Sequence, residues 1–167
     1  APGVDELVLY FAGSLAGPDM TGAMSAWVND PLGPNQVDAS FGGCESLNLA
    51  LGEVNSEEPM LRQAAAEGRT LFVSTGDTGG SCTVLTGNGV LNTVAPQVEW
   101  PASSASVVAV GGTTLYTDGA ERPTRPLEKA SADTAGGMSV VHAPPAWQRG
   151  LPATPAPARV PPRGPPG

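Results

Sequence analysis

Basic side chains, histidine, cysteine and long apolar runs are scarce in this sequence of 167 residues. Residues 1–120 hold 13 acidic side chains against two basic ones, Arg62 and Arg69, a net charge of −11. Because recognition of phosphate backbones needs a basic face, we expect no nucleic-acid partner. No stretch approaches the roughly 18 consecutive apolar residues of a membrane-spanning helix, and no leader-like pattern is visible. We therefore expect a soluble chain without a membrane partner.

Glycine and proline are abundant, and proline is unevenly distributed. The chain has 22 glycines and 18 prolines, and nine of the prolines fall in the last 24 residues. The net charge also reverses, to +3, in residues 121–167. A segment with so little apolar surface cannot offset the entropy of ordering. We expect a folded part in residues 1–117, an irregular continuation in 118–150 and a Pro-rich, disordered tail in 151–167.

Apolar segments of strand length alternate with helical patterns in the folded part. The segments expected to be strands are Val4–Ala12, Val37–Phe41, Thr70–Thr75, Val107–Val110 and Thr113–Tyr116. One helix is expected after a cap at Asp19, and the segment Ser46–Gly68 is expected to hold a second that begins at Pro59. This alternation is typical of right-handed crossovers in a mainly parallel α/β sheet flanked by helices.

Ligands of parallel sheets bind at the carboxyl ends of the strands. One such end is the turn Ser74-Thr75-Gly76-Asp77-Thr78-Gly79, in which glycines flank a carboxylate. Glycine permits a sharp turn and close approach of a substrate. An aspartate in such a turn also commonly caps its own backbone, so this motif alone leaves both interpretations open.

Several motifs in one order carry a more specific signal. They are Ser40-Phe41-Gly42, then Ala65-Ala66-Glu67-Gly68-Arg69-Thr70, then Ser74–Gly79, then Pro101-Ala102-Ser103-Ser104, then Val110-Gly111-Gly112-Thr113-Thr114. Together they resemble the sedolisins, serine-carboxyl peptidases with a subtilisin-like fold. A fainter likeness continues in Gly136-Gly137-Met138-Ser139 and Pro145-Ala146-Trp147-Gln148. The resemblance implies an incomplete subtilisin-like α/β domain and a peptide or protein substrate.

The resemblance also implies a mechanism with a Ser-Glu-Asp triad and a separate aspartate in the oxyanion hole. Asp77 matches that oxyanion aspartate. Because only a protonated carboxyl can donate a hydrogen bond to the oxyanion, such enzymes act at acid pH. By the same resemblance, Ser40, Phe41 and Gly42 pair with the substrate as an added strand. Ser74, Thr75 and Gly76 match the floor of the specificity pocket. Phe41 could equally be a core aromatic residue.

The remaining catalytic residues of the family have no match in the sequence. A Glu-x-x-x-Asp pair is absent, and the nearest pattern, Glu53 and Glu57, is expected to be a solvated helix face. Gly112-Thr113-Thr114 reads as strand and not as the turn that carries the nucleophile. The calcium site of the family has no counterpart either. We therefore expect no cofactor in this chain, and Ca²⁺ only in a full-length family member.

Cys44 and Cys82 are the two cysteines, and each follows the carboxyl end of an expected strand. In the implied fold a disulfide between them would tie the two substrate-lining loops, in keeping with a secreted protein. Buried free thiols are the alternative. The single histidine, His142, lies in the irregular continuation and is expected to be solvated.

Three hypotheses follow. The first is a fragment of a secreted, acid-acting, monomeric serine-carboxyl peptidase that is itself inactive. The second is a non-catalytic peptide-binding domain or pseudoenzyme, for which the missing catalytic residues argue. The third is a different doubly wound α/β domain.

Overall fold

A three-stranded parallel sheet organises the part of the chain that carries the motifs. The computed structural model describes residues 3–86, 89–92, 96–117, 119, 127–134 and 136–148. The strands are β1 (Gln36–Ala39), β3 (Thr70–Ser74) and β7 (Val108–Val110), in the order β1-β3-β7. Val37 pairs with Leu71, and Val73 pairs with Ala109. The predicted mainly parallel sheet is confirmed, and each strand lies within about two residues of its expected bounds.

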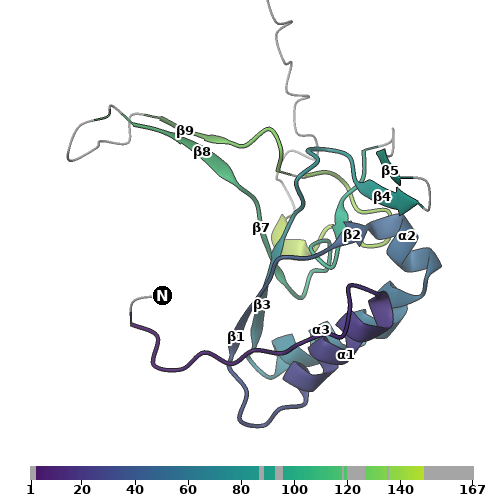
Figure 1. The fold of residues 1–167 in the computed structure, drawn as a ribbon, viewed down its shortest axis with the longest axis vertical. Helices are drawn as coiled ribbons and strands as arrows, with labels where there is room; N and C mark the ends of the chain where they lie inside the picture. The colour runs from purple at the N-terminus through teal and green to yellow at the C-terminus, as the bar shows by residue number, and fades with distance from the viewer. Residues whose placement is uncertain are drawn as a thin grey trace, which may run out of the picture.

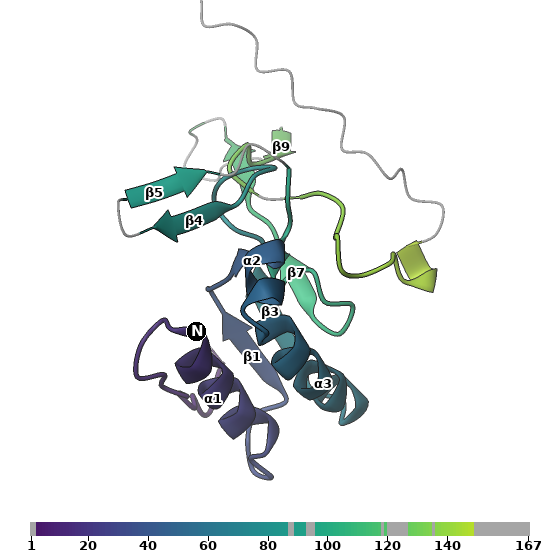
Figure 2. The same ribbon diagram turned by 90° about the vertical axis from the view of Figure 1, so that its right-hand side faces the viewer.

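Two helices cover one face of this sheet. Helix α1 (Gly17–Val28) and helix α3 (Glu53–Ala66) pack side by side, with β1 and β3 behind them (Figures 1 and 2). The cap position of α1 is Ala16, and Asp19 lies within the first turn, where it accepts a hydrogen bond from the Ser14 hydroxyl at 2.6 Å. The expectation of an N-cap at Asp19 is therefore wrong by three residues.

The segment Ser46–Gly68 forms two helices. A short helix, α2 (Glu45–Ala50), is separated from α3 by Gly52, whose φ of +83° suits glycine. Pro59 lies inside α3 and does not begin it, which corrects the prediction. Gly68 follows the helix with a φ of +79°, the left-handed conformation expected of a residue that ends a helix.

The core lies between the helical layer and the sheet. Its buried apolar members are Met24, Trp27 and Val28 of α1, Val54, Leu61 and Ala64 of α3, Ala39, Leu71 and Val73 of the sheet, and Trp100. Trp27 also donates its indole N–H to the Pro34 carbonyl at 2.9 Å. Burial of side chains of this size stabilises the fold by roughly 1.5–3 kcal/mol each.

Three two-stranded sheets surround the parallel sheet. Strand β2 (Gly43–Cys44) pairs with β6 (Glu99–Trp100), and β4 (Thr83–Thr86) pairs with β5 (Gly89–Asn92). Strand β8 (Thr113–Tyr116) pairs with β9 (Leu127–Ala130) in an arm that extends away from the core (Figure 1). The segment 118–150 thus contributes a strand, β9, and a 3₁₀ turn, η1 (Ala146–Gln148), where an irregular continuation was expected.

The segment Val4–Ala12 is extended but forms no strand, which corrects another prediction. Leu7 and Phe11 are 77% and 84% exposed, and Tyr10 is the member that packs against the core. Its hydroxyl donates to Asp30 Oδ2 at 2.9 Å. The last residues of this run, 10–12, line a hollow together with the end of β1, but in the described part of the chain no residue of the run pairs with a strand.

Two expectations concern the chain beyond this core. The tail of residues 151–167 lies outside the described residues. Among the described residues, no helix has the length and apolar character needed to cross a membrane.

Candidate functional site

The carboxyl ends of the parallel strands converge on a hollow of about 360 Å³. The end of β3 and the turn after it contribute Ser74, Thr75, Gly76 and Asp77, all of which the sequence singled out. The end of β7 contributes Val110, and the loops after β7 and β9 contribute Gly111, Gly112, Ser131, Asp133 and Thr134. This edge of the sheet is where a parallel arrangement places ligands.

A second hollow, of about 470 Å³, lies at the end of β1. Ser40 and Phe41 line it together with Asp38, Ala39, residues of the segment 10–15 and two residues of α1. Phe41 is half-buried: it packs against the core and also lines this hollow, and its role in substrate binding stays a prediction. The predicted substrate-binding residues therefore divide between two neighbouring strand ends, with Ser40 and Phe41 at one and Ser74–Gly76 at the other.

Glu99 lies between those two strand ends, and sequence reasoning missed it. A Cβ built on Gly76 would stand 2.3 Å from Glu99 Oε1, and one on Gly42 would stand 3.1 Å from Glu99 Oε2. A side chain at Gly76 would displace the Glu99 carboxyl group, and one at Gly42 would also meet the Trp100 carbonyl oxygen at 2.9 Å. Burial raises the pKa of Glu99, and the neighbouring charge of Asp77 raises it further. The site thus brings Glu99 close to Asp77, and Asp77 is the more exposed of these two residues.

Residues after position 117 complete the first hollow. Thr134 Oγ1 accepts a hydrogen bond from the Gly112 N–H at 2.7 Å and lies 3.3 Å from the Thr75 hydroxyl. The Gly79 N–H donates to the Asp133 carbonyl at 2.8 Å. These contacts hold the loop after β9 against the Asp77 turn.

A disulfide links the two loops that follow the site strands. Cys44 and Cys82 are bonded, with a Cα–Cα distance of 5.2 Å and a sequence separation of 38, and both are buried. Cys44 ends β2, directly after the Ser40–Gly43 segment, and Cys82 follows the Asp77 turn. The bond ties the loop of one strand end to the loop of the other.

Trp100 forms the packed support beneath Glu99. It is buried, and its backbone pairs with Gly43 across the β2–β6 ladder. Its indole N–H donates to Glu57 Oε2 at 2.6 Å, while Glu57 Oε1 accepts from the Thr21 hydroxyl at 2.6 Å. Glu57 is 4% exposed, so the expectation of a solvated face at Glu53 and Glu57 is wrong.

Glu53 shares this environment. Its carboxyl group lies against Gly17 at the start of α1. Burial raises the pKa of Glu53, and the charge of Glu57 adds to the effect. The pair faces α1, because the turn of α3 that carries both residues packs against that helix.

The single histidine also differs from expectation. His142 is not solvated: its side chain is 17% exposed and stacks on Trp100, with the ring centroids 5.7 Å apart. It lines neither hollow. In the described part of the chain, no group of three or more histidine, cysteine, aspartate or glutamate residues could hold a metal ion.

The site can bind an extended chain and can supply a hydrogen bond from a carboxyl group. Ser40 and Gly42 are exposed residues, and small hydroxyl and glycine residues line the first hollow. Asp77 and Asp133 line the first hollow, and both residues are exposed. Neither hollow, as described, contains a histidine or thiol beside a serine.

Comparison with known proteins gives consistent matches. The chain is 35% identical over 162 residues to "Sedolisin" from Pseudomonas sp. (strain 101), an alignment that covers 91% of this chain and 27% of the relative. It is 25% identical over 183 residues to "Xanthomonalisin" from Xanthomonas sp. (strain T-22), covering 89% of this chain and 22% of the relative. No family model matches the sequence.

A solved structure matches with a TM-score of 0.69 and 33% identity. It is a Pseudomonas sedolisin, a serine-carboxyl proteinase complexed with two molecules of pseudo-iodotyrostatin, and the match covers 86% of this chain and 42% of that one. The fold is therefore the subtilisin-like α/β fold of that enzyme. This chain spans about a quarter of the length of the curated relatives and extends the likeness past residue 117.

Proposed function

Because the chain belongs to the sedolisin family, we propose that it forms the substrate-binding and oxyanion-binding part of a serine-carboxyl peptidase that hydrolyses peptide bonds at acid pH. One observation carries this proposal. The strand ends that hold Ser40–Gly42 and Ser74–Gly76 lie side by side, and Asp77 stands at the rim of the hollow between them and the loop after β9.

Peptide binding at this edge follows from backbone chemistry. A substrate in extended conformation pairs its main-chain groups with Ser40 and Gly42 as an added strand, and main-chain hydrogen bonds supply affinity without fixing the sequence bound. A side chain of the substrate then enters the hollow floored by Ser74, Thr75 and Gly76. The small residues there favour entry of a side chain of moderate size.

Asp77 supplies the electrostatic part of catalysis. In its acid form the carboxyl group donates a hydrogen bond to the oxygen of the scissile carbonyl as negative charge develops on it. The ionised form only accepts hydrogen bonds, so this contribution is lost as pH rises. The carboxyl group of Glu99, close by, adds to the cost of a second negative charge in the site.

The nucleophile, the glutamate base and the third triad residue belong to other parts of such an enzyme. This sequence has no Glu-x-x-x-Asp pair and no serine in a Gly-Thr-Ser turn. We therefore propose that the chain alone binds peptides without cleaving them, and that Ca²⁺ belongs to the longer family member. The buried disulfide favours a secreted, oxidising location. We propose that the chain is a monomer, because it corresponds to part of a single peptidase domain.

The same absence of catalytic residues favours a second candidate, a non-catalytic peptide-binding domain. Both candidates use the strand ends, and they differ in the role of Asp77. A chimera that replaces the matching part of the Pseudomonas sedolisin by this chain supplies the missing residues and separates the two. Asp77→Ala in an active chimera should lower kcat by roughly 10²–10³ with little change in KM.

Asp77→Asn is the matched variant for this experiment. It keeps a hydrogen-bond donor but removes the titrating proton. It should therefore retain more activity than Asp77→Ala, and its activity should fall less steeply than that of the unchanged chimera as pH rises. An aspartate that only caps its turn gives a different result. Asp77→Ala would then lower stability by roughly 0.5–2 kcal/mol and leave kcat of the folded fraction unchanged, which would exclude the oxyanion role.

A further inference from the structure

The second hollow, at the end of β1, is lined mainly by apolar side chains. Phe11 and Leu15 come from the segment before α1, Ala23 from α1, and Phe41 from the residues that follow β1. Asp38 is the one charged residue that lines it in the described part of the chain. Its volume of about 470 Å³ lies within the range of roughly 300–1,000 Å³ that is usual for ligand sites. The hollow is therefore suited to an apolar group.

Two of these side chains are large, apolar and open to solvent. Leu15 is 86% exposed and Phe11 is 84% exposed, although both stand beside the hollow. Single exposed apolar residues are ordinary at a protein surface, whereas apolar residues gathered around a hollow are typical of binding grooves. A ligand that fills the hollow removes part of both side chains from water, which favours binding.

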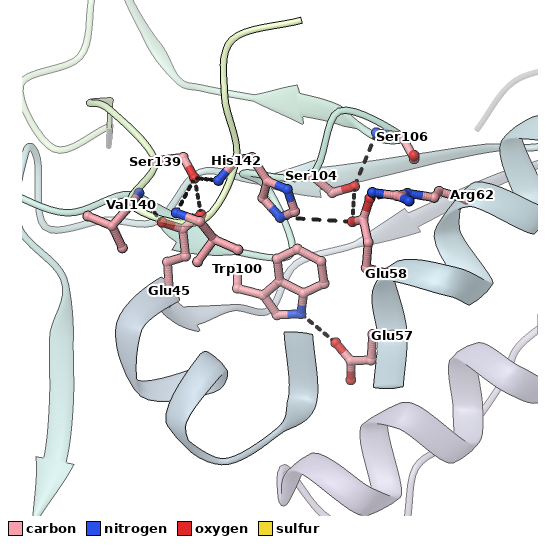
Figure 3. Close-up of polar contacts among 11 residues, drawn as sticks. Glu45, Glu57, Glu58, Arg62, Trp100, Ser104, Ser106, Ser139, Val140 and His142 are labelled. Atoms are coloured by element: carbon pink, nitrogen blue, oxygen red, sulfur yellow. Dashed lines mark hydrogen bonds and ion pairs between the residues drawn. The ribbon is translucent and has the colours of Figure 1, made fainter. Parts of the chain in front are cut away.

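The helical wall of the hollow is held in place. Ala23 precedes the buried Met24 in α1, and Thr21 of the same helix donates to Glu57 Oε1 at 2.6 Å. The other carboxyl oxygen of Glu57 accepts from the indole N–H of the buried Trp100 (Figure 3). These contacts tie α1 to α3 and β6, so this wall stands in position before a ligand arrives. A wall that is already ordered costs less conformational entropy on binding than a flexible one.

The segment after β1 connects the two hollows. Ser40 and Phe41 line the second hollow. Gly42 lies against the Glu99 carboxyl group, which also lies against Gly76 of the first hollow. An extended peptide paired with this segment therefore passes both hollows. Peptides bound as an added strand place alternate side chains in pockets of the protein.

We propose that the second hollow receives a bulky apolar side chain, aromatic or branched aliphatic, from a peptide bound along Ser40–Gly42. The site then selects peptides by two side chains, one of moderate size in the first hollow and a larger apolar one in the second. Phe11, Leu15 and Ala23 set this preference, because the first two supply apolar surface and the small Ala23 side chain leaves space. This inference rests on the proposed peptide binding and adds to it a preference for sequence.

Titration of the whole chain with synthetic peptides, followed by nuclear magnetic resonance, tests the proposal. An unstructured host peptide of alanine and serine is compared with derivatives that carry a single phenylalanine at successive positions. At one position, phenylalanine should lower Kd roughly tenfold or more, because its apolar side chain leaves water. Binding of that derivative should also shift the methyl signals of Leu15 and Ala23, whereas the host peptide should leave them in place.

The possible results separate this preference from peptide binding itself. If the host peptide shifts the amide signals of Ser40–Gly42 but no phenylalanine lowers Kd, peptide binding stands and the preference is overturned. If phenylalanine shifts the Ala23 signal without any shift of Ser40–Gly42, the hollow binds apolar groups away from an added strand, which overturns both. Absence of binding by every peptide also overturns both.

Substitutions in the hollow assign the preference to its residues. Ala23→Leu fills part of the hollow and should remove most of the gain from phenylalanine, while the host peptide binds unchanged. Ala26→Leu makes the same change at an exposed position of α1 that lines neither hollow, and should keep the gain. Leu15→Ser alters an exposed side chain and should reduce the gain, with Leu32→Ser, at a 93% exposed position, as its control. A gain that persists in both Ala23→Leu and Leu15→Ser, or that disappears in either control, contradicts the proposal.

Discussion

The carboxyl group of Glu99 fills the space beside the α-carbon of Gly76, so closely that a methyl group there would stand 2.3 Å from Oε1. Gly76 also has a φ of +94°, a conformation that other residues rarely adopt. Gly76 follows the end of β3, Glu99 begins β6, and Asp77 comes directly after Gly76. Glu99 thus lies close enough to Asp77 for the charge of Asp77 to raise the pKa of its carboxyl group.

Gly76→Ala should destabilise the chain through both effects, the positive φ and the contact with Glu99. Strain of this kind costs roughly 1–3 kcal/mol. Gly68→Ala is the matched control, since Gly68 has a φ of +79° with open space around it and isolates the backbone effect. In urea unfolding, Gly76→Ala should lower the free energy of unfolding more than Gly68→Ala does. Adding Glu99→Ala to Gly76→Ala should remove this difference. Equal losses at the two glycines would contradict the described contact.

Removing the Glu57 carboxyl group should destabilise the core. In Glu57→Ala the Trp100 indole N–H and the Thr21 hydroxyl lose their acceptor, and an unsatisfied buried donor costs about 1–3 kcal/mol. Glu57→Gln keeps one acceptor and should lose less. Asn55→Ala, at an exposed position of the same helix, should change the free energy of unfolding by under about 0.5 kcal/mol. A loss for Glu57→Ala no larger than that of Asn55→Ala would place Glu57 in solvent.

The raised pKa of Glu99 predicts a specific pH dependence of stability. A carboxyl group whose pKa is higher in the folded state binds its proton more tightly there, so its contribution is present in acid and lost as pH rises through the folded-state pKa. Glu99→Gln should therefore remove part of the fall in thermal stability above about pH 4.5. Glu53, whose pKa is also raised, accounts for a further part. Identical profiles for wild type and Glu99→Gln, from pH 3 to 8, would contradict this account.

The disulfide should contribute strongly to stability. Closing a loop of 38 residues is worth about 3–4 kcal/mol in the chain-entropy description. Protein made in an oxidising compartment should show no thiol that reacts with an alkylating reagent before reduction and two after it, measured by intact mass. Two reactive thiols before reduction would contradict the bond. Reduction should lower the urea midpoint, because the loops at the two strand ends are then no longer linked.

The sequence predicted the three parallel strands and the antiparallel strand β8 well, because their apolar runs are short and bounded by turn residues. Thr70–Thr75 matches β3 to one residue, and Thr113–Tyr116 is β8. The run Val4–Ala12 carried the same signal and still forms no strand, because pairing depends on neighbours that periodicity does not reveal. Pro59 was misread for a similar reason: a proline tolerated within α3 looks the same in sequence as one that begins a helix.

The candidate site was predictable where motifs carried it and not elsewhere. Asp77 and the residues before it come together at the hollow as the fold implied. Glu99, Thr134 and His142 reach their places through contacts between distant parts of the chain, so no local pattern marks them. Glu57 was predicted to lie on an exposed face of a helix. Its burial depends on contacts with Trp100 and Thr21, which are 43 and 36 residues away in sequence.

Peptide binding at the paired strand ends is the central claim, and backbone amide shifts measured by nuclear magnetic resonance test it most directly. Titration of the chain at pH 4 with unstructured peptides should shift the amide signals of Ser40–Gly42 and Ser74–Asp77 together, with one dissociation constant. The exposed arm of β8 and β9 should stay unchanged. Saturating peptide that leaves the signals of both strand ends in place, or that shifts only the arm, would contradict the account.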